Sequence, residues 1–174
     1  MNKIYFVTGS QDLYGEETLR QAAKDSTVIS GFLNEKLSDI AEVVFMPVVK
    51  TACEAEDICV KASSDKECIG VIMWMHMFSP AKMWIRALKA LKKPMLHLHT
   101  QFNEKLPYDS IDMDFMNLNQ SAHGDREFGF ICTRLGIKRE VVVGYYRHED
   151  VTEKPHRKDV FQCGLCLCLF LVLS

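Results

Sequence analysis

Hydrogen-bonding side chains crowd the segment 113–130, which is the part of the sequence best suited to chemistry. Amides, a hydroxyl and an imidazole follow one another there, at Asn117, Asn119, Gln120, Ser121 and His123. Polar groups this dense, beside apolar neighbours such as Phe115, are typical of a surface that binds a polar ligand. His123 is the strongest candidate, because an imidazole can donate or accept a proton near neutral pH. A purely structural role for His123 is the alternative.

Two other segments have some features of phosphate or calcium sites, but lack the full pattern. The glycines of segment 9–15 do not have the GxGxxG or GK[ST] spacing of nucleotide-binding loops. Asp109, Asp112 and Asp114 alternate with apolar residues, without the glycine and terminal glutamate of a calcium loop. We therefore favour solvated or helix-capping roles for these carboxylates.

Metal binding and nucleophilic catalysis are also disfavoured. His97 and His99 have strand spacing and share one face, so a two-histidine metal site is conceivable, but the sequence offers no nearby third ligand. The chain has no GxSxG elbow and no cysteine beside an obvious base. The residues alone therefore favour neither a catalytic nucleophile nor a metal site in this chain.

The seven cysteines do not have the spacing of a disulfide framework. Four lie in apolar or helical surroundings, where free and buried thiols are expected, namely Cys53, Cys59, Cys68 and Cys132. Free thiols favour a reducing cytoplasm. Cys163 and Cys166 have CxxC spacing, but no second pair or histidine completes a zinc site.

Length and composition favour one globular domain. The chain has 174 residues, of which 48% are hydrophobic and 25% charged. Its net charge is −2 and its basic residues are scattered, so nucleic acid is not an expected partner. The N-terminus lacks a signal-peptide pattern, and the uncharged run after Asp159 is shorter than the ~20 residues that span a bilayer, so no membrane association is expected.

The end of the chain differs in character from the rest. We assign residues 1–150 to one domain and residues 151–174 to a divergent tail rich in cysteine and leucine, which includes Cys168. Our interpretation is that this tail is the abnormal end of a truncated or frame-shifted chain. A buried terminal strand is the alternative.

Strand-like and helix-like patterns alternate along the remainder. Short apolar runs predict five strands, at 3–8, 41–49, 68–75, 94–99 and 140–145. Apolar residues at helical spacing predict intervening helices at 16–37, 54–63, from Pro80 to about 92, and 118–135. Strands that alternate with helices indicate an α/β fold, with a doubly wound, mostly parallel five-stranded sheet covered by helices on both faces. The strand order is expected to be flavodoxin-like, within the wider Rossmann-like class.

In such a sheet, ligands bind outside the carboxyl ends of the strands. The unusual polar segments follow predicted strands one, three and four, at 9–15, 76–80 and 99–102, and the helix after the crowded segment starts at the same edge. This convergence predicts that the functional surface lies at the carboxyl edge.

Four motifs in these positions resemble one known family. They are GSQDLYG at 9–15, WMHMFSPAKMW at 74–84, HTQF at 99–102 and DSIDMDFMNLNQSAHG at 109–124. With them the chain is similar to the N-terminal domain of bacterial L-arabinose isomerases, from the first strand to about Val143. The resemblance fades beyond about Arg147.

The resemblance implies an isomerase that interconverts L-arabinose and L-ribulose, and often D-galactose and D-tagatose, with a divalent metal that is usually Mn²⁺. Two glutamates and two histidines of later domains hold that metal in the family, so no bound metal is expected here and this fragment alone should be inactive. Substrate-contacting residues of the N-terminal domain reach the site of a neighbouring subunit, which implies a homo-oligomer. By motif match these residues are Gln11, Leu13, Tyr14, Gln120 and His123.

Two other functions are kept as alternatives. The chain could be a non-catalytic module that binds a sugar or assembles with another subunit through the same edge. A nucleotide- or flavin-binding domain is supported only by analogy of fold.

Overall fold

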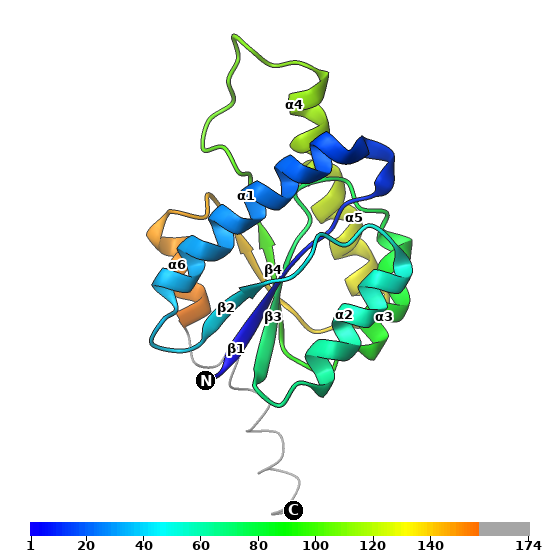
Figure 1. Ribbon diagram of the computed structural model, residues 1–174, viewed down its shortest axis with the longest axis vertical. Coiled ribbons are helices and arrows are strands. Elements are labelled where there is room, and N and C mark those ends of the chain that lie inside the picture. The colour runs from blue at the N-terminus through cyan, green and yellow to red at the C-terminus, as the bar shows by residue number, and fades with distance from the viewer. Residues whose placement is uncertain (157–174) are drawn as a thin grey trace, which may run out of the picture.

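The computed structural model describes residues 1–156, and it has a five-stranded parallel sheet at its centre (Figure 1). The strands lie in the order β2-β1-β3-β4-β5. Their bounds are β1 Lys3–Thr8, β2 Glu42–Phe45, β3 Cys68–Trp74, β4 Met95–His99 and β5 Glu140–Val143. This order and direction confirm the predicted doubly wound fold with flavodoxin-like topology.

Helices cover both faces of the sheet, as the apolar strands require. On one face lie α1 (Gly15–Lys36) and α6 (Glu149–His156), and on the other lie α2 (Ala52–Ser64), α3 (Trp84–Ala90) and α5 (Ser121–Arg134). Successive strand residues point to opposite faces, so Ile4 and Phe6 join the core beneath α1 while Tyr5 and Val7 join the core beneath α2 and α3.

The helix predicted at 118–135 is α5, which starts at Ser121, and a separate short helix that was not predicted, α4 (Met113–Leu118), precedes it. Asn119 leaves the helical conformation (φ −121°, ψ 64°), and the backbone N–H of Gln120 donates to the His76 carbonyl at 2.9 Å. That long-range hydrogen bond fixes the break. The Asp112 carboxylate caps α4 by accepting from the Phe115 N–H at 2.7 Å, which confirms its predicted capping role. In Figure 1, α4 and the loop before it project beyond the sheet.

Several element ends differ from prediction. The second strand stops at Phe45, and Val49 makes only an isolated bridge with Gly9. The segment after Pro80 begins with a 3-10 turn at Ala81–Met83, and α3 starts at Trp84. Helix α6 was not predicted. No helix in residues 1–156 is long and apolar enough to cross a membrane.

Three of the four core cysteines are buried as predicted, but Cys53 is exposed. It stands in the first turn of α2 on the solvent side, while Ala55, Cys59 and Ala62 form the buried stripe of that helix. Burial raises the pKa of the Cys59 thiol to about 12, which keeps it protonated and inert. The predictions for Cys163, Cys166, Cys168 and the apolar tail lie outside the described residues.

Candidate functional site

Polar segments from three strand ends meet at the carboxyl edge of the sheet. Backbone hydrogen bonds join the segment after β1 to its neighbours, from the Gly9 N–H to the Trp74 carbonyl at 3.1 Å and from the Ser10 N–H to the Val49 carbonyl at 2.8 Å. The Ser10 hydroxyl also lies 3.5 Å from the sulfur of Met77, in the segment that follows β3. The first loop is therefore anchored to the centre of the sheet.

The first loop presents three of the expected site residues, Gln11, Leu13 and Tyr14. They flank or belong to a 3-10 turn at Asp12–Tyr14, which an ion pair between Lys50 Nζ and Asp12 Oδ1 secures at 2.9 Å. The Leu13 side chain is 84% exposed, whereas Gln11 and Tyr14 are half-buried. An apolar side chain this exposed on an anchored turn is available to contact a ligand or another protein.

The start of α5 presents the other two, Gln120 and His123. Gln120 is half-buried and immediately precedes the helix, and His123 is exposed in its first turn. Gly124 allows this placement, because a Cβ atom there would collide with the carbonyl oxygens of Met75 and Met77. The first turn of α5 therefore packs directly on the backbone that follows β3.

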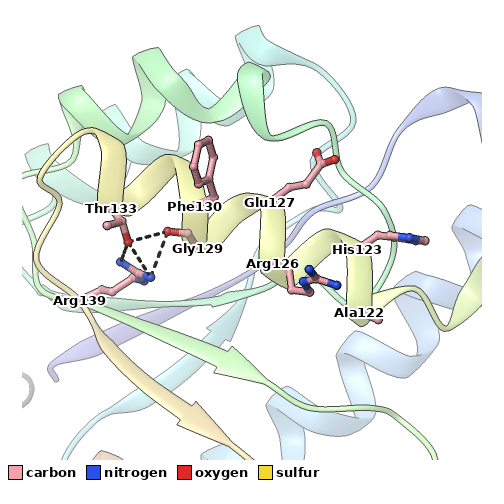
Figure 2. A pocket seen from close by; sticks show the side chains of 8 residues that line it. All are labelled: Ala122, His123, Arg126, Glu127, Gly129, Phe130, Thr133 and Arg139. Atoms are coloured by element: carbon pink, nitrogen blue, oxygen red, sulfur yellow. Dashed lines mark hydrogen bonds between the residues drawn. The ribbon is translucent and has the colours of Figure 1, made fainter.

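His123 lines an open hollow of about 650 Å³ along the outer side of α5 (Figure 2). Arg126, Glu127 and the 62% exposed ring of Phe130 share this hollow. In Figure 2, Arg139 and His123 lie at opposite ends of the hollow. The Nη2 atom of Arg139 donates to the Gly129 carbonyl at 3.1 Å. The hollow thus combines charged groups of both signs with an aromatic ring.

A buried imidazole lies just beyond the end of β3, at His76. His76 is 1% exposed, and its ring stacks on Trp74 with 4.6 Å between centroids and 11° between planes. Neither ring nitrogen has a hydrogen-bond partner in the part of the chain that the structure describes. Burial lowers the pKa of His76 from 6.5 to about 3, so the ring is neutral at physiological pH.

The two histidines of β4 converge on a carboxylate that the sequence analysis missed. His97 Nε2 lies 2.6 Å from Asp125 Oδ1, and His99 Nε2 lies 3.5 Å from Asp125 Oδ2. Asp125 is 2% exposed. The 2.6 Å contact is a hydrogen bond between the His97 imidazole and the Asp125 carboxylate, and it fixes the orientation of the His97 ring. Residues 1–156 contain no group of three or more histidine, cysteine or acidic side chains arranged to hold a metal ion.

One signal could have identified Asp125. Asp125 lies in the buried stripe of α5, whose other members recur at helical spacing, namely Ser121, Gly124, Phe128 and Cys132. An acidic residue on an apolar helix face requires a partner, and His97 and His99 were the unassigned candidates.

The structure brings all five expected residues to one edge, on two sides of segment 75–79. Gln11, Leu13 and Tyr14 lie on the β1 side, and Gln120 and His123 lie on the α5 side. Within the described residues, no hydrogen bond joins the two groups directly. The two groups are linked indirectly through segment 75–79. The Gln120 N–H donates to the His76 carbonyl, and Ser10 of the first loop contacts the sulfur of Met77.

These features define an α/β domain of flavodoxin-like order whose candidate contact residues gather at the carboxyl edge of its sheet. The family model of the L-arabinose isomerase N-terminal domain matches residues 1–159. The chain belongs to this family. The match continues past Arg147, where the resemblance by motif was expected to fade, and it includes α6.

Proteins that are similar in sequence to this chain are named L-arabinose isomerase. The protein of Flavobacterium johnsoniae is 57% identical over 152 residues, which are 87% of this chain and 30% of the relative. Those of Geobacillus thermodenitrificans and Herpetosiphon aurantiacus are 55% and 52% identical over the same length, 87% of this chain and 31% and 30% of the relatives. The chain thus spans about 30% of the length of these relatives.

Proposed function

We propose that this chain provides the sugar-contacting N-terminal portion of an L-arabinose isomerase, an enzyme of arabinose catabolism that interconverts L-arabinose and L-ribulose. D-galactose and D-tagatose are the second substrate pair in this proposal. The observation that carries it is the identity of 52–57% over 152 residues with proteins of that name. The five expected contact residues lie at the edge where doubly wound sheets bind ligands, which supports the same conclusion.

Each contact residue has a role that fits its position. The amides of Gln11 and Gln120, the Tyr14 phenol and the exposed His123 imidazole are groups that hydrogen-bond to sugar hydroxyls. Leu13 forms an apolar wall, which suits its 84% exposure on an anchored turn. Because Leu13 and His123 point away from their own core, we propose that they contact a sugar held in a neighbouring subunit of a homo-oligomer.

In this proposal, the metal-binding residues lie outside this chain. The described residues do not fit a Mn²⁺ site, because no three of their histidine, cysteine or acidic side chains form a ligand group. We assign Mn²⁺ to two glutamates and two histidines in the part of the relatives that this chain does not span. The chain alone is then inactive as an isomerase. A cytoplasmic location agrees with the free buried thiols of Cys59, Cys68 and Cys132.

Complementation tests this function. The purified chain is mixed with an L-arabinose isomerase that lacks its own N-terminal portion, and ketose formation from L-arabinose is measured with Mn²⁺ present. We expect the mixture to form L-ribulose and each part alone to form none. The double variant Gln120→Ala/His123→Ala should fail to restore activity, while Cys53→Ser, which changes an exposed residue of α2, should restore it fully. Ketose formation by the chain alone would contradict the assignment of the metal.

The second candidate is a non-catalytic module that binds a sugar or assembles with another subunit. Its support is that the exposed Leu13 and His123 lie at one edge of the sheet, where they are available to a sugar or to another subunit. Calorimetric titration with L-arabinose and with ribitol separates the two candidates. Saturable heat without any complementation would favour the module, and a flat titration of folded protein would exclude sugar binding by the module.

A further inference from the structure

A second hollow lies at the carboxyl ends of β4 and β5, and it contains none of the five expected sugar contacts. Its volume is about 350 Å³, which is within the range of small-molecule sites. His99, Gln101, Glu104, Ser121 and Tyr145 contribute its polar and aromatic lining. We call this space the β4–β5 hollow.

The lining of the β4–β5 hollow has the chemistry of a carbohydrate site. An amide, an imidazole, a hydroxyl and one carboxylate provide donors and acceptors, and a tyrosine ring provides an aromatic surface. Its ten lining residues include no lysine or arginine. An anionic ligand would therefore lack a cationic partner and would meet the carboxylate of Glu104. The lining favours a neutral ligand that is rich in hydroxyl groups.

Buried groups pack behind His99 at the edge of the hollow. The His99 ring is stacked with that of His97, with 6.0 Å between centroids and 9° between planes. Asp125 Oδ2 lies 3.5 Å from His99 Nε2, and Asp125 is itself held by His97 at 2.6 Å. Of these three residues, only His99 reaches the hollow, where its side chain is 31% exposed. The His97 ring and the Asp125 carboxylate thus pack behind His99, and Asp125 Oδ2 makes no hydrogen bond within the described residues.

A second wall contains a buried acceptor that has no partner. Gln101 Nε2 donates to the Ser121 hydroxyl at 2.6 Å, which sets the orientation of the amide. The Gln101 Oε1 atom is buried and accepts no hydrogen bond from the residues that the structure describes. A buried carbonyl without a donor is costly, and a turn of this amide toward the hollow would let a ligand hydroxyl supply the donor.

The third wall is aromatic and is also held from behind. Gly144, with φ at 140°, turns the chain out of β5, and its N–H donates to the His99 carbonyl at 3.2 Å. The Tyr145 ring then packs against Tyr146 and against His148, with 4.8 Å and 5.4 Å between centroids. His148 Nε2 in turn lies 3.2 Å from Glu104 Oε1, which fixes the carboxylate of this wall.

We propose that the β4–β5 hollow is a second small-molecule site of this chain, and that it takes a neutral polyhydroxylated ligand, either a sugar or a polyol. His99 and Gln101 contact its hydroxyls, and the Tyr145 ring packs against its carbon skeleton. The proposal is independent of the proposed function, because none of the five expected sugar contacts lines the β4–β5 hollow, although Ala122 lines both hollows.

Titration of the ¹⁵N-labelled full chain with ribitol, followed by amide NMR, tests this site. We expect saturable shifts of the Gln101 side-chain amide and of the Gly144 and Tyr145 amides. Inorganic phosphate, the anionic probe, should leave these signals unchanged. His99→Leu should weaken the response about ten-fold, as expected for the loss of one good hydrogen bond. The matched variant His123→Leu should leave the response at the β4–β5 hollow unaltered.

The results separate the two proposals. Shifts confined to Gln11, Leu13, Tyr14, Gln120 and His123 would support the proposed function and overturn the second site. Absence of saturable shifts at the β4–β5 hollow up to about 100 mM ribitol would overturn it outright, as would a response to phosphate alone. Should His99→Leu fail to fold, Tyr145→Ala changes a half-buried ring at the rim, and an undiminished response in that variant would overturn the proposal.

Discussion

The buried imidazole of His76 should make the stability of this protein depend on pH, and the size of the effect follows from its environment. Burial lowers the pKa of His76 from 6.5 to about 3. Below pH 6.5 the unfolded chain takes up a proton at this position and the folded chain does not, so stability falls as the pH falls. Above pH 6.5 both states are neutral there, and this contribution is constant. Between pH 6.5 and pH 5 the loss is 1.5 pH units, or about 2 kcal/mol at 1.36 kcal/mol per unit.

The substitution His76→Phe tests this reasoning. It removes the titrating group and retains a ring that can pack on Trp74. Urea unfolding at pH 7 and pH 5 gives the free energy of unfolding of both proteins at both values. We expect the wild type to lose about 2 kcal/mol more than the variant over this interval. A change in packing would shift the variant equally at both pH values, so it cancels in the difference.

Another titrating group makes the comparison between proteins necessary. Burial raises the pKa of Asp25 from 3.8 to about 6, and this group acts in the opposite direction over the same interval. It is present in both proteins, so its contribution also cancels. The matched control is His123→Phe, the same replacement at an exposed imidazole, which should keep the pH dependence of the wild type. Identical pH dependence in the wild type and in His76→Phe would refute the account of His76.

Three further predictions concern a buried charge, a close contact and a thiol. Asp25→Asn should stabilise the protein by about 3 kcal/mol above pH 6, where the 5% exposed carboxylate is ionised, and the gain should disappear by about pH 4; equal gains at pH 4 and pH 8 in thermal unfolding would contradict this. Gly124→Ala should destabilise the protein by more than about 2 kcal/mol, because the added methyl group collides with two carbonyls. Gly31→Ala, on the open side of α1, should stabilise it by about 0.5–1 kcal/mol. Chemical denaturation measures both changes, and an unchanged stability of Gly124→Ala would show that α5 is not held as described. Cys53 should react with a thiol reagent in the native protein, whereas Cys59, Cys68 and Cys132 should react only on unfolding, as peptide mapping by mass spectrometry would reveal; rapid native labelling of Cys59 would argue against its burial.

The central strands β1, β3 and β4 were predictable because each one is a short apolar run buried on both faces, which only a covered parallel sheet provides. The segment Cys68–Trp74 illustrates this, since nearly every residue in it is buried. The division of α4 from α5 was not predictable by periodicity. It depends on a hydrogen bond from Gln120 to His76, which is 44 residues away in sequence and is near only once the sheet has formed.

The location of the candidate site could be predicted from the sequence, whereas the side-chain pairs near it could not. Motif and strand position were enough to bring Gln11 and His123 to the carboxyl edge. The partner of His97 was missed because side-chain pairing between a strand and a later helix leaves only an indirect trace in sequence, here Asp125 on an apolar helix face. Exposure of Cys53 was missed because helix spacing alone did not fix which side of α2 faces the core.

The attachment of both contact groups to segment 75–79 has a consequence for substrate selectivity. Gln120 is bonded to the backbone of His76, and the first loop contacts Met77 through Ser10, so one buried segment determines the separation of the two groups. Exchanging a single exposed residue, such as Leu13, would alter the local shape of the proposed sugar surface and leave that separation unchanged. Under the proposed function, a change in the length of sugar that this surface accommodates should instead require substitutions within segment 75–79.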